Sequence, residues 1–238
     1  MHIAQLSLPL AAVALAACAP APVPAASTVA HPQEVFWQAL SSHCGKAYAG
    51  GLASTDARDA DWAGKRMVAH WAECDETRVA IAFHVEEAPP TPSSQAVGRI
   101  ETSSGSEAVG PEPSWNRSRT WIVTREGTGA DTRFTLKHDH RHADGEADAV
   151  TFYGGTSADA GSASAQDFPV DAESVTLFTR EGLTASLTNV WRIEVTPRGS
   201  ADARFAYQLT RHNDPTRLFR VEIDAGAPVE TPPAAWGW

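Results

Sequence analysis

Apolar and polar residues alternate along most of the chain, in runs that are short and evenly spaced. The run at 78–85 (RVAIAFHV) places Val79, Ile81 and Phe83 on one side of an extended backbone. Such alternation is typical of a strand that buries one face. Similar runs occur at 65–74, 119–125, 132–142, 149–153, 189–196, 204–211 and 217–224, separated by segments rich in turn-forming residues. The pattern predicts about eight antiparallel strands.

Helical spacing is confined to two short segments. The segment 32–45 begins with proline, ends with glycine and carries Phe36 and Leu40 at helical spacing. The segment 171–182 begins with an N-cap aspartate, ends with glycine and would bury Phe178. We therefore expect a mainly β fold, a single antiparallel barrel or sandwich with one or two short helices. A lipocalin-like closed barrel is preferred over a sandwich.

The first seventeen residues contain an apolar run from Leu8 to Ala17 and no charged side chain apart from His2. A membrane-spanning helix needs about 20 apolar residues, so this run indicates a secretory signal peptide instead. The segment 15–18 (LAAC) resembles the lipobox of bacterial lipoproteins, whose cysteine becomes the acylated first residue of the mature chain. An ordinary signal peptide followed by an unmodified cysteine is the alternative.

The lipobox resemblance implies a location and a first partner. Cys18 would carry acyl chains that insert into a lipid bilayer, where each buried methylene contributes roughly 0.8 kcal/mol. Ala19, which stands where aspartate would signal inner-membrane retention, implies the outer membrane of a Gram-negative bacterium. The expected localisation is therefore the cell envelope, with the protein lipid-anchored and its β-domain facing the periplasm.

Composition shifts divide the chain into segments. We expect a signal peptide at 1–17, a lipidated cysteine with a Pro- and Ala-rich tether at 18–32, and a β-rich domain at 33–224. A mobile loop at about 86–114 interrupts the domain, because it has many prolines, glycines and serines and few apolar residues. The segment 225–238 contains three prolines and is expected to form a flexible tail.

The charge limits the possible partners, and the cysteine content indicates the cellular compartment. The net charge of −10 argues against a nucleic-acid partner, which would require a basic face. With Cys18 assigned to the lipid, Cys44 and Cys74 remain, and an even remainder in an exported protein predicts a disulfide. Two buried free thiols are the alternative.

The stretch LKHDHRHADG carries three histidines at every second position. On a strand, His138, His140 and His142 share the inward face. The alternate polar residues, among them Asp139, lie on the other face, which is expected to face solvent. Neutral imidazoles are common ligands of divalent transition metals, so these residues are a candidate metal site that would need a further ligand from another strand. Two alternatives stay open: the imidazoles are hydrogen-bonded groups that complete the strand, or they perform acid/base catalysis.

The basic pair Arg117 and Arg119 is a second candidate site. Guanidinium groups bind carboxylates and phosphates, so the two arginines are candidate anion contacts. In a protein this acidic, ion pairs with Asp or Glu are the alternative. Arg119 begins the alternating run at 119–125, and Arg117 lies just before it.

The blocks RSRTWIVT, LKHDHRHADG, TFYGG, DFPVD, NVW, FAYQLTR and FRVEID resemble the signature blocks of an uncharacterised family of bacterial secreted and lipoprotein domains. The resemblance spans roughly 36–224 and implies a single exported domain without an assigned activity. We therefore expect a membrane-anchored binding or scaffold module with a small-molecule ligand. A metal-dependent or acid/base enzyme centred on the three histidines is the alternative, and a purely structural envelope protein is the second.

Overall fold

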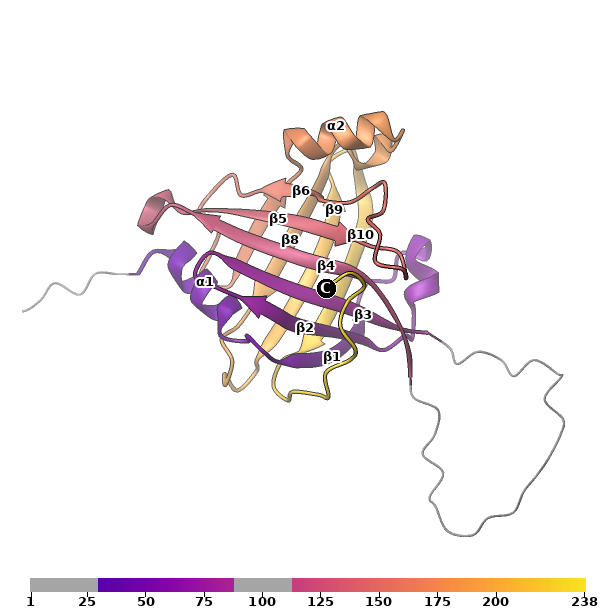
Figure 1. Ribbon diagram of the computed structural model, residues 1–238. Helices are drawn as coiled ribbons and strands as arrows, with labels where there is room; N and C mark the ends of the chain where they lie inside the picture. Colours follow the sequence, from indigo (N-terminus) through magenta and orange to yellow (C-terminus); the bar gives the residue numbers. More distant parts are fainter. Residues whose placement is uncertain (1–29, 88–112) are drawn as a thin grey trace, which may run out of the picture.

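The chain folds into an antiparallel barrel, shown in Figure 1, which confirms the predicted mainly β architecture. The computed structural model describes residues 30–87 and 113–238, and within them ten strands form one sheet. The strands are β1 (Ala47–Leu52), β2 (Met67–Cys74), β3 (Arg78–Glu87), β4 (Ser114–Glu126), β5 (Arg133–His140), β6 (Tyr153–Thr156), β7 (Ala165–Pro169), β8 (Asn189–Val195), β9 (Arg204–Arg211) and β10 (Asp214–Asp224).

The sheet closes almost completely on itself. From β1 to β6 and from β7 to β10, each strand pairs with its neighbours in sequence, and β1 pairs with β10. At the remaining seam, a single bridge between Gly155 and Val170 joins β6 and β7. A Cβ atom at Gly155 would overlap the carbonyl oxygens of Phe168 and Pro169, so glycine is required where the seam closes.

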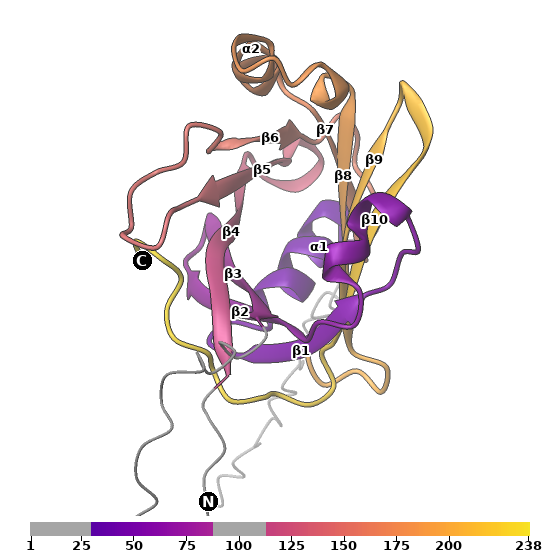
Figure 2. The ribbon, with the colours of Figure 1, turned by 90° about the vertical axis from the view of Figure 1, so that its right-hand side faces the viewer.

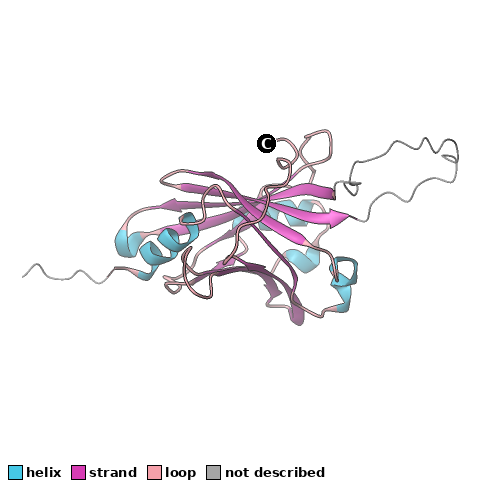
Figure 3. Ribbon diagram, turned by 90° about the horizontal axis from the view of Figure 1, so that it is seen from below, coloured by secondary structure: helices cyan, strands magenta, loops and turns pink. Residues whose placement is uncertain are grey.

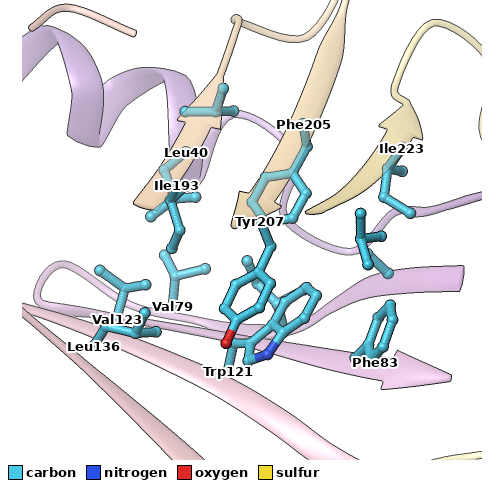
Figure 4. Packing of buried hydrophobic residues seen from close by; sticks show 14 of the residues in the cluster. Leu40, Val79, Phe83, Trp121, Val123, Leu136, Ile193, Phe205, Tyr207 and Ile223 are labelled. Carbon is cyan, nitrogen blue, oxygen red and sulfur yellow. The ribbon is translucent and has the colours of Figure 1, made fainter. Parts of the chain in front are cut away.

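The two halves of the sheet form two layers around the core. In Figure 1 strands β2–β5 cross in front of β8–β10, and Figure 3 shows the same two layers from below. Alternate residues point inward, as the sequence pattern predicts. Among the largest fully buried side chains are Trp71, Trp191 and Phe205, and Figure 4 shows inward residues of both layers packed together.

The two α-helices lie on different sides of the barrel. Helix α1 (Pro32–Ser41) covers one end, where Phe36 packs edge-on against Phe134 with ring centroids 5.2 Å apart. Helix α2 (Ala172–Arg180) lies beyond β6, away from α1 (Figures 1 and 2). Its N-cap is Asp171, whose side chain accepts a hydrogen bond from the Ser174 amide. Short 3₁₀ turns η1 (Ala57–Trp62), η2 (Gly129–Asp131) and η3 (Thr184–Ser186) complete the described elements.

Two strands were not predicted from the alternation pattern, and a third begins later in the sequence than predicted. Strand β1 (AYAGGL) lacks alternating polar residues; at Gly50 a Cβ atom would overlap the Glu222 carbonyl of β10. Strand β7 ends at a proline beside the open seam. The strand predicted at 149–153 begins only at Tyr153, because the preceding residues form part of a long connection from β5.

The C-terminal segment 225–238, predicted as a flexible tail, docks on the outer face of the barrel. His84 Nε2 donates to the Pro233 carbonyl at 2.9 Å, and the Trp236 amide donates to the Arg117 carbonyl at 3.0 Å. Trp238 Nε1 donates to Asp139 Oδ2 at 2.9 Å. Asp139 is therefore 1% exposed and not solvent-facing as predicted, because the tail covers this face.

Cys44 and Cys74 form a disulfide, as predicted, and thereby link the chain after α1 to the end of β2. The predicted signal peptide, Cys18, most of the tether and the central part of the predicted loop, 88–112, lie outside the described residues. In the part of the chain that is described, no helix combines the length and apolar character needed to cross a membrane.

Candidate binding cavity

The barrel contains a cavity of about 340 Å³ at the end opposite to α1. Strand β5 connects the two ends: Phe134, near its start, packs against α1, whereas His138 and His140 line the cavity. Turn η1, the connection from β5 to β6 and the segment after α2 contribute to the rim. The cavity is therefore a pocket with a floor of core side chains.

Aromatic side chains form much of the cavity wall. Trp121 of β4 stacks on Tyr207 of β9, with ring centroids 4.3 Å apart and planes 9° apart, an arrangement visible in Figure 4. Near the rim, Trp62 of η1 packs edge-on against Phe219 with centroids 5.4 Å apart. Trp191 of β8 lies beside His138. The wall thus offers several flat apolar surfaces to an enclosed molecule.

His138 is hydrogen-bonded at both ring nitrogens, and its burial keeps the ring neutral. Nδ1 lies 3.0 Å from the Tyr153 carbonyl oxygen, which can only accept, so Nδ1 carries the proton. Nε2 then accepts a hydrogen bond from the Tyr207 hydroxyl at 2.8 Å. Burial, assisted by the charge of nearby His140, lowers the pKa of His138 to about 3. The ring is therefore a fixed, uncharged part of the wall.

His140 lies next to His138 and is also neutral at physiological pH. Its Nε2 lies 3.1 Å from the Tyr153 hydroxyl. Burial and the Arg119 charge lower the pKa of His140 to about 4, against smaller opposite effects of Asp148 and Asp139. Burial raises the pKa of Tyr153 to about 12. The histidines and tyrosines thus form a neutral hydrogen-bonded network.

The third histidine of the predicted site is not in the cavity. Strand β5 ends at His140, and the side chain of His142 is 59% exposed, with its Nε2 3.7 Å from Asp148 Oδ2. Among the described residues no three His, Cys, Asp or Glu side chains are arranged to hold a metal ion. The structure therefore does not bring His138, His140 and His142 together as a metal site, because the strand ends before His142 and both nitrogens of His138 are engaged.

The two arginines of the second predicted site are separated by an irregularity in β4. The β3–β4 register shifts between the pairs Phe83–Arg119 and Val85–Asn116. Arg119 consequently points into the cavity, whereas Arg117 lies on the outer face and donates to the Ala234 carbonyl at 2.8 Å. A bulge redirects side chains in this way. Of the predicted anion contacts, the structure brings only Arg119 to the cavity.

Two further arginines lie at the rim. Arg217 of β10 is paired with Asp59 of η1 through Nη2 and Oδ1 at 2.8 Å. Arg211, at the end of β9, donates from Nε to the Asn189 side-chain oxygen at 2.9 Å. Burial and the charges of Arg217 and Arg58 lower the pKa of Arg211. Arg217 is thus neutralised by a carboxylate, whereas Arg211 binds a neutral amide oxygen.

Two residues of the cavity, Tyr207 and Arg211, are not among the site residues predicted from the sequence. Both continue the inward face of β9, in register with Phe205. A polar residue that continues an apolar face is the same signal that identified the histidines of β5, and it could have been applied to β9. Trp62 lies in a 3₁₀ turn without periodicity and gave no comparable signal.

Comparison of the chain with protein-family models, curated proteins and solved structures finds no match. The resemblance to secreted and lipoprotein domains stays a prediction. We therefore infer the function from the geometry of the cavity.

Proposed function

We propose that this protein is an exported lipoprotein whose barrel binds a small molecule in the cavity. The anchor would be acylated Cys18, holding the domain at the outer membrane with the barrel facing the periplasm. The cavity supports the binding part of the proposal. The predicted signal peptide at 1–17 and the LAAC motif at 15–18 support the anchor.

The cavity has the properties of a small-molecule site. Its volume of about 340 Å³ falls within the range of about 300–1,000 Å³ typical of such sites. Aromatic rings dominate the wall, and a few polar groups are held by hydrogen bonds to neighbouring residues, as in His138 with Tyr207. A barrel with only a structural role would be expected to fill its interior with side chains, as this one does at the α1 end.

Acid/base catalysis by the histidines is less well supported. The pKa of His138 is about 3 and that of His140 about 4. A general acid or base works best when its pKa lies near the working pH. Neither imidazole meets this condition near neutral pH, so we assign both to the wall of a binding site.

Binding can be tested with N-phenyl-1-naphthylamine, a neutral dye that fluoresces in apolar sites. We expect saturable binding to the full chain carrying Cys18→Ala, which lacks the acylated residue and so needs no detergent. Ser186 lines the rim, and Ser186→Trp should obstruct the cavity. Ser164 is exposed and outside the lining, so Ser164→Trp is the matched control. Equal binding by both tryptophan variants would contradict a ligand site in the cavity.

The anchor requires a separate test. Fractionation of cells that express the unaltered chain should place it with the outer membrane, and Cys18→Ala should release it into the soluble periplasmic fraction. Loss of the acyl chains would remove the only lipid attachment that the proposal includes. Retention of Cys18→Ala at the membrane would refute anchoring through this residue.

A further inference from the structure

Arg119 is a cationic, half-buried side chain that lines the cavity. Its guanidinium lies over the Trp62 ring at 4.8 Å from the centroid. Its Nη1 donates to the Ser118 hydroxyl at 3.0 Å, and no carboxylate of the described residues forms an ion pair with it. Burial lowers the pKa of Arg119. The guanidinium therefore keeps donors that are unused within residues 30–87 and 113–238.

Among the other half-buried arginines, Arg117 and Arg211 bind neutral oxygen acceptors, whereas several have carboxylate partners. Arg125 pairs with Glu34 at 3.0 Å, and Arg220 pairs with Glu194 at 2.9 Å. The chain has 29 acidic and 19 basic residues, so carboxylates are abundant. A buried cation is unfavourable unless it is paired. Arg119, whose hydrogen-bond partner among the described residues is the Ser118 hydroxyl, is therefore available to an anionic group that is not part of the barrel.

The acidic residues of the cavity lining are already engaged. Asp59 binds Arg217, and Asp148 accepts a hydrogen bond from the Val150 amide at 2.7 Å while lying near His142. Because His138 and His140 are neutral, they neither add to nor cancel the charge of the arginines. The cavity therefore combines two arginines that lack a carboxylate partner among the described residues, Arg119 and Arg211, with flat apolar surfaces.

We propose that the ligand is a small organic acid with a flat, aromatic body. Its carboxylate, phosphate or sulfonate would pair with the Arg119 guanidinium, and its rings would lie against the stacked Trp121 and Tyr207. Arg211 at the rim would attract the anion as it enters. This inference names the ligand class for the proposed cavity site and rests on that proposed function.

Two dyes that differ by one sulfonate provide the test. 1-Anilinonaphthalene-8-sulfonate is the anionic counterpart of N-phenyl-1-naphthylamine, and both are titrated into the full chain carrying Cys18→Ala. We expect the anionic dye to bind more tightly. Hydrogen bonds to charged groups contribute about 1.5–3 kcal/mol, so Arg119→Met should weaken the anionic dye at least about tenfold. Its effect on the neutral dye should be less than about threefold.

Control variants separate a local effect from a change in net charge or folding. Arg198→Met removes the same charge from an exposed turn and should leave both affinities unchanged. Arg119→Gln, which keeps a polar side chain, should lose the same preference, and it replaces Arg119→Met if that variant does not fold. Thermal unfolding provides a second readout: because Arg119 lacks an ion pair in the described structure, Arg119→Met should unfold at the same temperature as the parent or higher.

The results distinguish failure of the proposed ligand class from failure of cavity binding. Equal affinity for the two dyes, or equal weakening of both by Arg119→Met, would overturn the assignment of an organic acid while leaving cavity binding intact. If Ser186→Trp does not weaken the neutral dye, the proposed function fails instead. A large loss of thermal stability in both Arg119 variants would show that the arginine is structural and would also overturn the inference.

Discussion

Neutral, buried histidines should make this barrel sensitive to acid. His138 is 2% exposed, and its pKa of about 3 lies far below the value of 6.5 expected in the unfolded chain. Between these two values the unfolded state binds more protons than the native state, so stability falls as the pH falls. The stabilising contribution is fully present above pH 6.5 and is lost progressively towards pH 3. From pH 7 to pH 5, His138 alone should lower the free energy of unfolding by about 2 kcal/mol.

The variant His138→Gln isolates this contribution. Glutamine does not titrate, and its amide can still donate to the Tyr153 carbonyl and accept from the Tyr207 hydroxyl. Urea unfolding at pH 7 and pH 5 gives the loss of stability for the parent and for the variant. The parent should lose about 2 kcal/mol more than His138→Gln. Other histidines with lowered pKa values, such as His43 and His84, act equally in both proteins and cancel in the difference.

The exposed His142 provides the matched control for this experiment. His142→Gln removes one histidine from the same stretch, and we expect it to retain the full pH dependence of the parent. The reasoning would be refuted if His138→Gln lost as much stability between pH 7 and pH 5 as the parent does. That outcome would mean that His138 is protonated in the native state or that its ring is accessible to water.

Three further predictions concern the scaffold. The double variant Cys44→Ser/Cys74→Ser opens a link across 30 residues and should lose about 3–4 kcal/mol in urea unfolding; an unchanged midpoint under oxidising conditions would contradict the disulfide. Gly155→Ala should strain the β6–β7 seam and cost about 1–3 kcal/mol, whereas Gly51→Ala, where the nearest atom to the added Cβ is the Lys65 carbonyl oxygen at 3.5 Å, should not disturb the seam when amide exchange of β6 is measured. Trp238→Ala removes a donor from buried Asp139 and should cost about 1–3 kcal/mol; unaltered amide exchange in β5 would argue against a docked tail.

Alternation predicted most of the barrel because each strand has one buried face. The runs around Ile81 and Ile193 appear in the structure as β3 and β8, with these side chains fully buried. Strand β1 was missed because its glycines serve backbone contact with β10, and such contact leaves no periodic signal. The tail was misjudged because its proline content indicated disorder, whereas its tryptophans bind the outer face of the barrel.

The site was only partly predictable for a related reason. Alternation correctly placed His138 and His140 on an inward face, since that inference needs only the strand itself. It could not show that β5 ends before His142 or that a bulge in β4 separates Arg117 from Arg119. Both features depend on pairing with neighbouring strands. The partners that bury and hydrogen-bond the imidazoles, among them Tyr207, come from distant parts of the sequence.

A crystal structure of the protein grown with 1-anilinonaphthalene-8-sulfonate would test the central claim most directly. We predict that the dye occupies the cavity, with its sulfonate within hydrogen-bond distance of the Arg119 guanidinium and its rings against Trp121 and Tyr207. Dye bound only on the outer surface, with the cavity unoccupied under conditions that saturate its fluorescence, would contradict a ligand-binding barrel.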